Sequence, residues 1–184
     1  LVIMVHSFRQ TVELWVHNTV TGDIFIRAEM AETNRYRDPI PEKAVRFLES
    51  LDGPFEMDIY RRIYLVYDDS LYQLEALTWD VYLRYGRFFW VDGDPAAGVE
   101  RLKRGEGVVV SEVFANRTGL GTGDVFEASI VGARFQLPVI GVIRDYRTRG
   151  GVVYFSLKHF RGGTGDTHWG GVRIFLKDRG DYLS

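Results

Sequence analysis

Apolar side chains recur at helical spacing over the first twenty residues, with polar side chains such as Arg9, Gln10 and Glu13 between them. The apolar positions are Leu1, Met4, Val5, Phe8, Val12, Trp15 and Val16. This period predicts an amphipathic helix that ends at Gly22-Asp23. The apolar run at its start is neither a signal peptide nor a complete membrane span, and it lacks an initiator methionine. We expect a helix that leaves a membrane span, although a surface helix of a soluble domain has the same pattern.

The pattern next predicts a strand and a second helix. Residues Ile24 to Ala28 are rich in β-branched and aromatic side chains, which favours a strand. A helix is predicted to begin at Pro41, a residue favoured in the first helical turn, and to stop at Asp52-Gly53-Pro54. Its inward-facing side chains are expected to be Ala44, Phe47, Leu48 and Leu51.

Two longer strand-like runs follow, from Ile59 to Tyr67 and from Leu71 to Trp79. The short polar turn Asp68-Asp69-Ser70 separates them, which predicts an antiparallel hairpin. On the second strand, Tyr72, Leu74 and Ala76 are expected to share one face.

Capping signals place two helices around a short buried strand. Asp94-Pro95 combines a side-chain acceptor with a first-turn proline, and Gly105 closes that helix, in which Val99 and Leu102 face inward. Val108-Val109-Val110 is then the strand. Ser111 caps a short helix that includes Phe114 and ends at Gly119.

After Asp124 the apolar period changes to two. One predicted strand places Phe126, Ala128 and Ile130 on the same side, and a turn is predicted at Gly132. The returning strand carries Phe135, Leu137 and Val139. Its Pro138 is suited to an edge strand or a β-bulge. Runs from Ile140 to Tyr146 and from Val152 to Leu157 flank Arg149-Gly150-Gly151, which predicts another hairpin in an antiparallel meander. A glycine-rich loop from Gly162 to Gly171 then leads to a last strand, Val172 to Leu176.

Composition and charge narrow the function. The 184 residues, 46% hydrophobic and 26% charged, are those of an ordinary globular protein, and a net charge of −2 argues against nucleic-acid binding. The chain has two arginine-rich stretches. One comprises Arg61-Arg62 with Arg84 and Arg87, and the other comprises Arg144, Arg147 and Arg149. Acidic residues such as Asp58 and Asp145 lie nearby in the sequence, so we interpret both stretches as solvated strand faces. The chain has no cysteine, which excludes disulfides and thiolate sites. The absence of cysteine does not indicate on which side of a membrane the protein lies.

The glycine-rich segments do not predict a cofactor. The glycines from Gly119 to Gly123 follow a helix and precede a strand, whereas a dinucleotide-binding turn runs from a strand into a helix. We interpret them as a helix cap followed by a turn. The run from Gly162 to Asp166 lacks the Lys-Ser/Thr pair of a phosphate loop.

No catalytic or metal site stands out. Of the four histidines, His6, His17, His159 and His168, only the last two are placed to share a site, with Asp166, and their spacing matches no zinc pattern. Among carboxylates, neither Asp68-Asp69 nor Glu56 with Asp58 is a better acid–base candidate than the other. Ser111 is explained by capping, and no Gly-x-Ser-x-Gly motif is present. We therefore predict no catalytic, cofactor-binding or metal-binding residue, and no cofactor.

Several segments together resemble the extracytoplasmic domain of MacB/FtsX-like ABC transporter permeases. The segments are Ser7 to Thr11 with Trp15, Gly22 to Ile24, Val108 to Ala115, Thr118 to Leu120, Gly123 to Val125, Pro138 to Tyr146, Gly151 to Ser156, Val172 to Leu176 and Gly180-Asp181. Most are caps, turns and strands of moderate specificity, and their order along nearly the whole chain carries the resemblance. The chain stops at Ser184, where the family usually continues through another helix to the membrane.

The resemblance implies an α+β fold in which a porter-like lobe of βαβ-type pieces carries an inserted antiparallel β-rich lobe, preceded by an N-terminal helix continuing from a transmembrane span. We assign residues 1–20 to that helix, 21–70 and 158–184 to the porter-like lobe, and 71–157 to the inserted lobe. The strands Ile24 to Ala28, part of Ile59 to Tyr67, and Val172 to Leu176 should then share one sheet.

The resemblance also implies a domain that is not an enzyme. It would lie on the periplasmic side of the inner membrane and couple hydrolysis by a cytoplasmic ATPase subunit to export, lipid or lipoprotein extraction, or activation of a partner. Its implied partners are the ATPase, a second permease copy or permease partner, and a periplasmic adaptor, lipoprotein or peptide cargo, without nucleic acid. The alternatives are a free-standing extracytoplasmic ligand-binding protein, which needs a large closed pocket, and a secreted hydrolase, which needs convergent titratable groups.

Overall fold

The computed structural model describes residues 22–177 except 32, 34, 36, 68 and 146–149. The predicted N-terminal helix over residues 1–20 and the end of the chain from 178 onward lie outside the described residues. The strands are β1 (Ile24–Arg27), β2 (Phe55–Tyr67), β3 (Ser70–Leu77), β4 (Trp90–Asp92), β5 (Val108–Ser111), β6 (Val125–Ile130), β7 (Ala133–Ile143), β8 (Val152–Ser156) and β9 (Gly171–Leu176). The helices are α2 (Glu42–Glu49), α3 (Trp79–Tyr85), α4 (Pro95–Arg104), α5 (Glu112–Thr118) and α6 (Leu157–Thr164). None of these helices is long and apolar enough to span a bilayer.

The strands of the described residues form a mixed sheet in the order β1-β9-β2-β3-β8-β5-β7-β4, with β6 paired to β7. The expected sharing of one sheet by the first, second and last predicted strands is confirmed, since β9 pairs with β1 on one side and β2 on the other. β2 and β3 form the expected antiparallel hairpin. The α+β fold predicted from the sequence is therefore confirmed.

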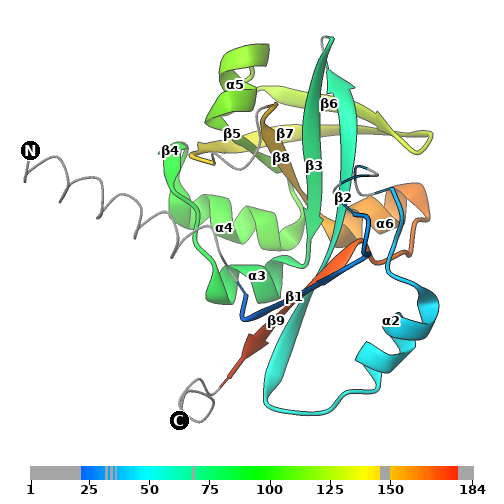
Figure 1. Ribbon diagram of the computed structural model, residues 1–184. Coiled ribbons are helices and arrows are strands. Elements are labelled where there is room, and N and C mark those ends of the chain that lie inside the picture. Colours follow the sequence, from blue (N-terminus) through cyan, green and yellow to red (C-terminus); the bar gives the residue numbers. More distant parts are fainter. Residues whose placement is uncertain are drawn as a thin grey trace, which may run out of the picture.

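Both ends of the described domain lie at the same edge of the sheet. β1 and β9 are antiparallel neighbours, so the chain enters and leaves side by side (Figure 1). The backbone N–H of Asp23 donates to the Ile174 carbonyl at 2.9 Å, and the Asp23 carboxylate accepts from the Leu176 N–H at 2.9 Å. The entry and exit segments are thus hydrogen-bonded to each other.

Each face of the central sheet is covered by a different apolar cluster. Successive valines of β5 alternate between the two, with Val108 and Val110 packed with Phe114 of α5, and Val109 packed with Leu102 of α4. All four residues of β5 are buried, which explains why this strand is an uninterrupted apolar run ending in a serine. A third cluster lies under α2, around Leu48, Trp169 and Val172.

The capping signals in the sequence mark real helix ends. Asp94 accepts hydrogen bonds from the N–H groups of Ala96 and Ala97, and Gly105 closes α4 with a left-handed backbone. Ser111 accepts from the N–H of Phe114, and Gly119, with φ of +74°, ends α5. Gly119 to Gly123 are accordingly a helix cap followed by a turn, as expected.

The predicted hairpin between Ile140 to Tyr146 and Val152 to Leu157 is wrong. β5 lies between β7 and β8, parallel to the first and antiparallel to the second. β3 and β8 are also parallel, so this region is not a simple antiparallel meander. The reason is that β5, apolar on both faces, belongs in the buried middle of the sheet rather than at an edge.

Three local predictions also need correction. The strand expected to reach Trp79 ends at Leu77, and Trp79 instead begins α3; neither α3 nor β4 was predicted. The segment from Gly162, expected as a loop, continues α6 to Thr164, and the left-handed Gly165 ends the helix. Gly163 is needed there because a side chain would collide with the Phe135 ring. In α2, Leu48 is buried as expected, but Phe47 is 62% exposed and Leu51 is also exposed.

The assignment of residues 71–157 to a separate lobe stays a prediction. Backbone pairing between β2 and β3 runs from Tyr60↔Leu77 to Tyr67↔Ser70, so the proposed boundary falls at the turn of a paired hairpin.

Candidate functional site

A buried ion network links three neighbouring strands. The guanidinium of Arg173 on β9 donates to Asp58 on β2 at 2.6 Å and forms a second ion pair with Glu75 on β3. All three side chains are at most 2% exposed. The sequence interpretation of Asp58 and its arginine neighbours as a solvated face is therefore wrong: Asp58 is at the centre of the network.

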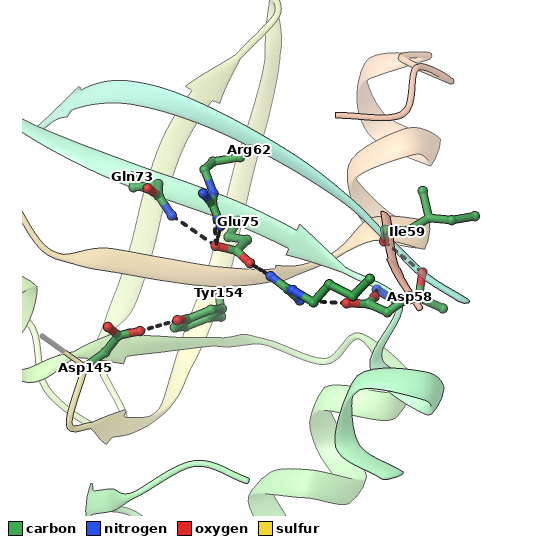
Figure 2. A network of polar contacts seen from close by, with 9 residues as sticks. Asp58, Ile59, Arg62, Gln73, Glu75, Asp145 and Tyr154 are labelled. Atoms are coloured by element: carbon green, nitrogen blue, oxygen red, sulfur yellow. Dashed lines mark hydrogen bonds and ion pairs between the residues drawn. The ribbon is translucent and has the colours of Figure 1, made fainter. Parts of the chain in front are cut away.

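Glu75 receives two more donors. Arg62 on β2 donates to its second oxygen at 2.9 Å through a terminal nitrogen, and the Gln73 amide donates to the same oxygen at 3.0 Å. Figure 2 shows Arg62 and Gln73 converging on Glu75. The rings of Tyr60 and Tyr82 lie 4.6 and 5.1 Å from the Arg173 guanidinium carbon, which adds cation–π contacts to the ion pairs.

Every carboxylate oxygen of the network is occupied. Asp58 accepts from the Thr78 N–H at 3.0 Å with one oxygen and from Arg173 with the other. Glu75 accepts from Arg173 with one oxygen and from Arg62 and Gln73 with the other. A carboxylate in this state is poorly placed to take a proton from a substrate. The arrangement instead holds β9, β2 and β3 in fixed register.

The charges in this network affect each other. Burial alone would lower the pKa of Arg173, but Glu75 and Asp58 outweigh that effect and raise it, so the guanidinium stays charged. Burial raises the pKa of Asp58 from 3.8 to about 6, although Arg173 and the Thr78 N–H oppose the shift.

The raised pKa of Asp58 gives a pH-dependent stability. Between about pH 4 and 6 the folded protein binds more protons at Asp58 than the unfolded chain does, so this stabilisation is complete below pH 4 and is lost as the pH rises through 6. Relative to Asp58→Asn, the wild type should lose about 2 kcal/mol of unfolding free energy between pH 4 and pH 7. Urea unfolding of both proteins at each pH measures this difference. A difference that stays constant with pH would contradict the shift.

Two of the sequence candidates come together at the edge of this region. The ring Nδ1 of His168 lies 2.8 Å from Asp166, whose other oxygen accepts from Nε of Arg61 at 3.1 Å. Burial would raise the pKa of Asp166, but the His168 and Arg61 donors outweigh it and lower it. His159 is not brought to this pair: its ring packs against Gly105 at the end of α4. Within the described ranges, no three histidine or acidic side chains are grouped as metal ligands.

The remaining sequence candidates have structural contacts. Ser111 accepts hydrogen bonds from the N–H groups of Phe114 and Val152, so its hydroxyl ties β5 to β8. Glu56 pairs with Arg84 and Lys177 at the surface. Asp69 lies in the β2–β3 turn, and its neighbour Asp68 is outside the described residues.

Glu75 and Arg173 were missed by the sequence reasoning. A signal was present: each is a charged residue in an otherwise apolar strand, at Leu74-Glu75-Ala76 and at Val172-Arg173-Ile174. A charge in a strand buried on both faces requires a partner, and a buried charge of opposite sign is the partner to look for.

Comparison with known proteins agrees with this architecture. The chain matches no protein-family model. It is 25% identical over 170 residues to an uncharacterised ABC transporter permease protein of Mycobacterium tuberculosis (strain H37Rv), a match that covers 91% of this chain and 19% of the relative. The chain therefore spans about one fifth of the length of that relative.

Two solved structures share the fold. One is the extracellular domain of the noncanonic ABC-type transporter YknZ from Gram-positive bacteria, with a TM-score of 0.57 and 14% identity over 85% of this chain and 82% of the other. The second is the periplasmic region of MacB from Actinobacillus actinomycetemcomitans, with a TM-score of 0.53 and 12% identity over 86% of this chain and 77% of the other. The chain has the fold of a MacB-like extracytoplasmic domain. The resemblance predicted from the sequence is confirmed.

In this MacB-like fold, the ion network lies next to the strands through which the chain enters and leaves the domain. β9, the last described strand, carries Arg173 and pairs with β1, through which the chain enters. The network therefore connects the edge where both ends lie to the long β2–β3 hairpin.

Proposed function

We propose that this chain is the non-catalytic extracytoplasmic domain of an ABC transporter permease. The observation that carries the proposal is the MacB-like fold over 85% of the chain, together with the sequence similarity to a permease over 91% of it. The adjacent entry and exit strands support it, because a domain inserted between two membrane spans must begin and end at one place.

The domain couples movement of the membrane spans to events outside the membrane. The helix that the sequence pattern predicts over residues 1–20 is, in this proposal, the stiff connection between a membrane span and β1, and a cytoplasmic ATPase subunit drives the spans. A second permease copy completes the transporter. The output is export, extraction of a lipid or lipoprotein, or activation of a partner, and the further partners are a periplasmic adaptor, a lipoprotein or a peptide cargo.

The ion network supports the coupling step. Displacement of β9 or β1 is transmitted to β2 and β3 because Arg173 is paired to both strands at once. Separating the partners of a buried ion pair is strongly destabilising, because it leaves an uncompensated charge in the interior. The sheet therefore moves as one body when its edge is pulled.

The location of the domain is tested by labelling. The chain has no cysteine, so Val131→Cys, at a position 68% exposed in the β6–β7 turn, gives one reactive site in it. In the full-length protein, with any other cysteine replaced, a membrane-impermeant maleimide should label this site in intact cells whose outer envelope is opened. Leu74→Cys, fully buried, is the control that should stay unlabelled in the folded protein. Labelling of Val131→Cys only after the inner membrane is permeabilised would place the domain in the cytoplasm and end the proposal.

The coupling is tested with a flexible insertion. Energy transfer from a fluorophore on Val131→Cys to an acceptor in the bilayer should change when ATP binds the reconstituted transporter. Four glycines inserted at Asn18 should abolish this change while ATP hydrolysis continues, because glycine breaks a stiff helix. The same insertion after the exposed Asp52, between α2 and β2, should leave the change intact. If the ATP-dependent change survives the Asn18 insertion, the movement does not reach the domain through a stiff helix, and the proposed stiff connection is wrong.

A further inference from the structure

A second region of the domain, apart from the ion network, has the features of a ligand site. A cavity of about 530 Å³ lies where the end of β3 and the start of α3 meet the last turn of α4 and the first turn of α6. This volume is within the range of small-molecule sites. Its apolar lining includes Leu77 and Leu157.

Four of the eleven residues that line the cavity are cationic. Lys103 and Arg104 of α4 and Lys158 and Arg161 of α6 contribute to the lining, against the single carboxylate Asp80. The first turn of α6 adds the positive end of a helix dipole, because Ser156, Leu157 and Lys158 also line the cavity.

The cations of α6 are the ones left to face a ligand. Lys103 pairs with Glu100, and Arg104 with Glu106, at the surface. Among the described residues, no carboxylate lies within ion-pair distance of Lys158 or Arg161. Burial lowers the pKa of the Arg161 guanidinium, against the opposing charge of Asp166, so a bound anion would relieve this cost.

Two lining residues also carry donors without partners. The indole N–H of Trp79, a residue only 4% exposed, and Nε of Arg161 are buried and make no hydrogen bond within the described part of the chain. A buried donor without an acceptor destabilises a fold and is rare in native proteins. Trp79 and Arg161 both line the cavity, while these two donor atoms are buried behind its surface; a terminal nitrogen of Arg161 donates to the Thr167 carbonyl at 3.3 Å.

We propose that this cavity binds the phosphate group of a small organic phosphate ester. Arg161 and Lys158 supply the charge, since a planar guanidinium and a mobile ammonium together suit the several oxygens of a phosphate. Trp79 lies in the wall, where its indole signal reports binding, and the apolar walls contact the organic part. The volume exceeds what inorganic phosphate alone fills. The same chemistry is found in a soluble phosphate ester and in a phospholipid headgroup.

The proposal goes beyond the coupling role and is tested without a membrane or ATPase. Glycerol 3-phosphate is titrated into the ¹⁵N-labelled 184-residue chain at constant ionic strength, and Trp79→Phe assigns the indole signal. We expect a saturable shift of the Trp79 indole N–H. Lys158→Gln, at an exposed position, should keep the fold and raise the dissociation constant about tenfold or more. Arg161→Gln should have a similar or larger effect.

A control variant distinguishes binding in this cavity from nonspecific attraction of an anion to the positive charges of the protein. Arg117→Gln removes an exposed cation from α5, outside the cavity lining, and should change the dissociation constant less than about twofold. Equal weakening by Arg117→Gln and Lys158→Gln, or the absence of a saturable Trp79 shift, would overturn the proposal. If phosphatidylglycerol vesicles cause the same Trp79 shift and phosphatidylcholine vesicles do not, the phosphate group belongs to a lipid headgroup. If only glycerol 3-phosphate causes the shift, the ligand is a soluble phosphate ester. Failure of this test leaves the coupling proposal unaffected.

Discussion

Arg173→Met is expected to lower the free energy of unfolding by about 3–5 kcal/mol, because it leaves Asp58 and Glu75 buried without their shared cation. The midpoint of urea unfolding at pH 7, with the slope held common to the variants, measures the loss. Arg46→Met is the matched control. Arg46 pairs with Glu42 at the surface of α2, and its loss should lower the free energy of unfolding by less than about 1 kcal/mol.

A triple variant shows whether Arg173→Met destabilises the fold through unpaired charges or through lost packing. Adding Asp58→Asn and Glu75→Gln to Arg173→Met removes the uncompensated charges and should restore part of the lost stability. If the triple variant is as unstable as Arg173→Met, lost packing around Tyr60 and Tyr82 explains the effect instead. If Arg173→Met unfolds at the same urea concentration as Arg46→Met, the network contributes no stability.

Gly151→Ala should destabilise the fold by about 2–4 kcal/mol, from backbone strain and overpacking together. Gly151 has φ of +90°, and a Cβ there would lie 2.7 Å from the backbone nitrogen of Phe114. Its carbonyl also accepts from the Gln73 N–H at 3.0 Å, so the backbone cannot move away without losing a bond to β3. Thermal and urea unfolding of the variant measure the loss.

Gly119→Ala isolates the strain in that loss. Gly119 has φ of +74° but nothing within 4 Å of the position a Cβ would take, so alanine should lower the free energy of unfolding there by only about 1 kcal/mol. Equal losses at the two glycines would show that the contact with Phe114 relaxes freely, contrary to expectation.

Features set by a few neighbouring residues could be predicted from the sequence. Asp94 with Gly105 and Ser111 with Gly119 mark helix ends because a cap is a contact within three or four residues. The β2–β3 and β6–β7 hairpins followed from short turns between alternating strands. The shared sheet of β1, β2 and β9 followed from the family resemblance and not from any local pattern.

Features that depend on distant partners were missed. The place of β5 between β7 and β8 is set by contacts between strands far apart in sequence, and only its apolar character on both faces indicated it. Asp58 was interpreted as solvated because Arg173, 115 residues away, could not be recognised as its partner. The cavity between α3, α4 and α6 required α3, which no pattern had indicated.

The hydrogen-bonded pairing of β1 with β9 also bears on how such a domain can be moved between proteins. Paired antiparallel strands bring the entry and exit points to about 5 Å, so a host chain has to open only at a single short turn to accommodate the whole unit. Because the folded domain itself holds the two ends together, inserting it costs the host chain no more loop-closure entropy than a tight loop would. A membrane protein could therefore gain or exchange this domain in one genetic insertion while its spans keep their original packing.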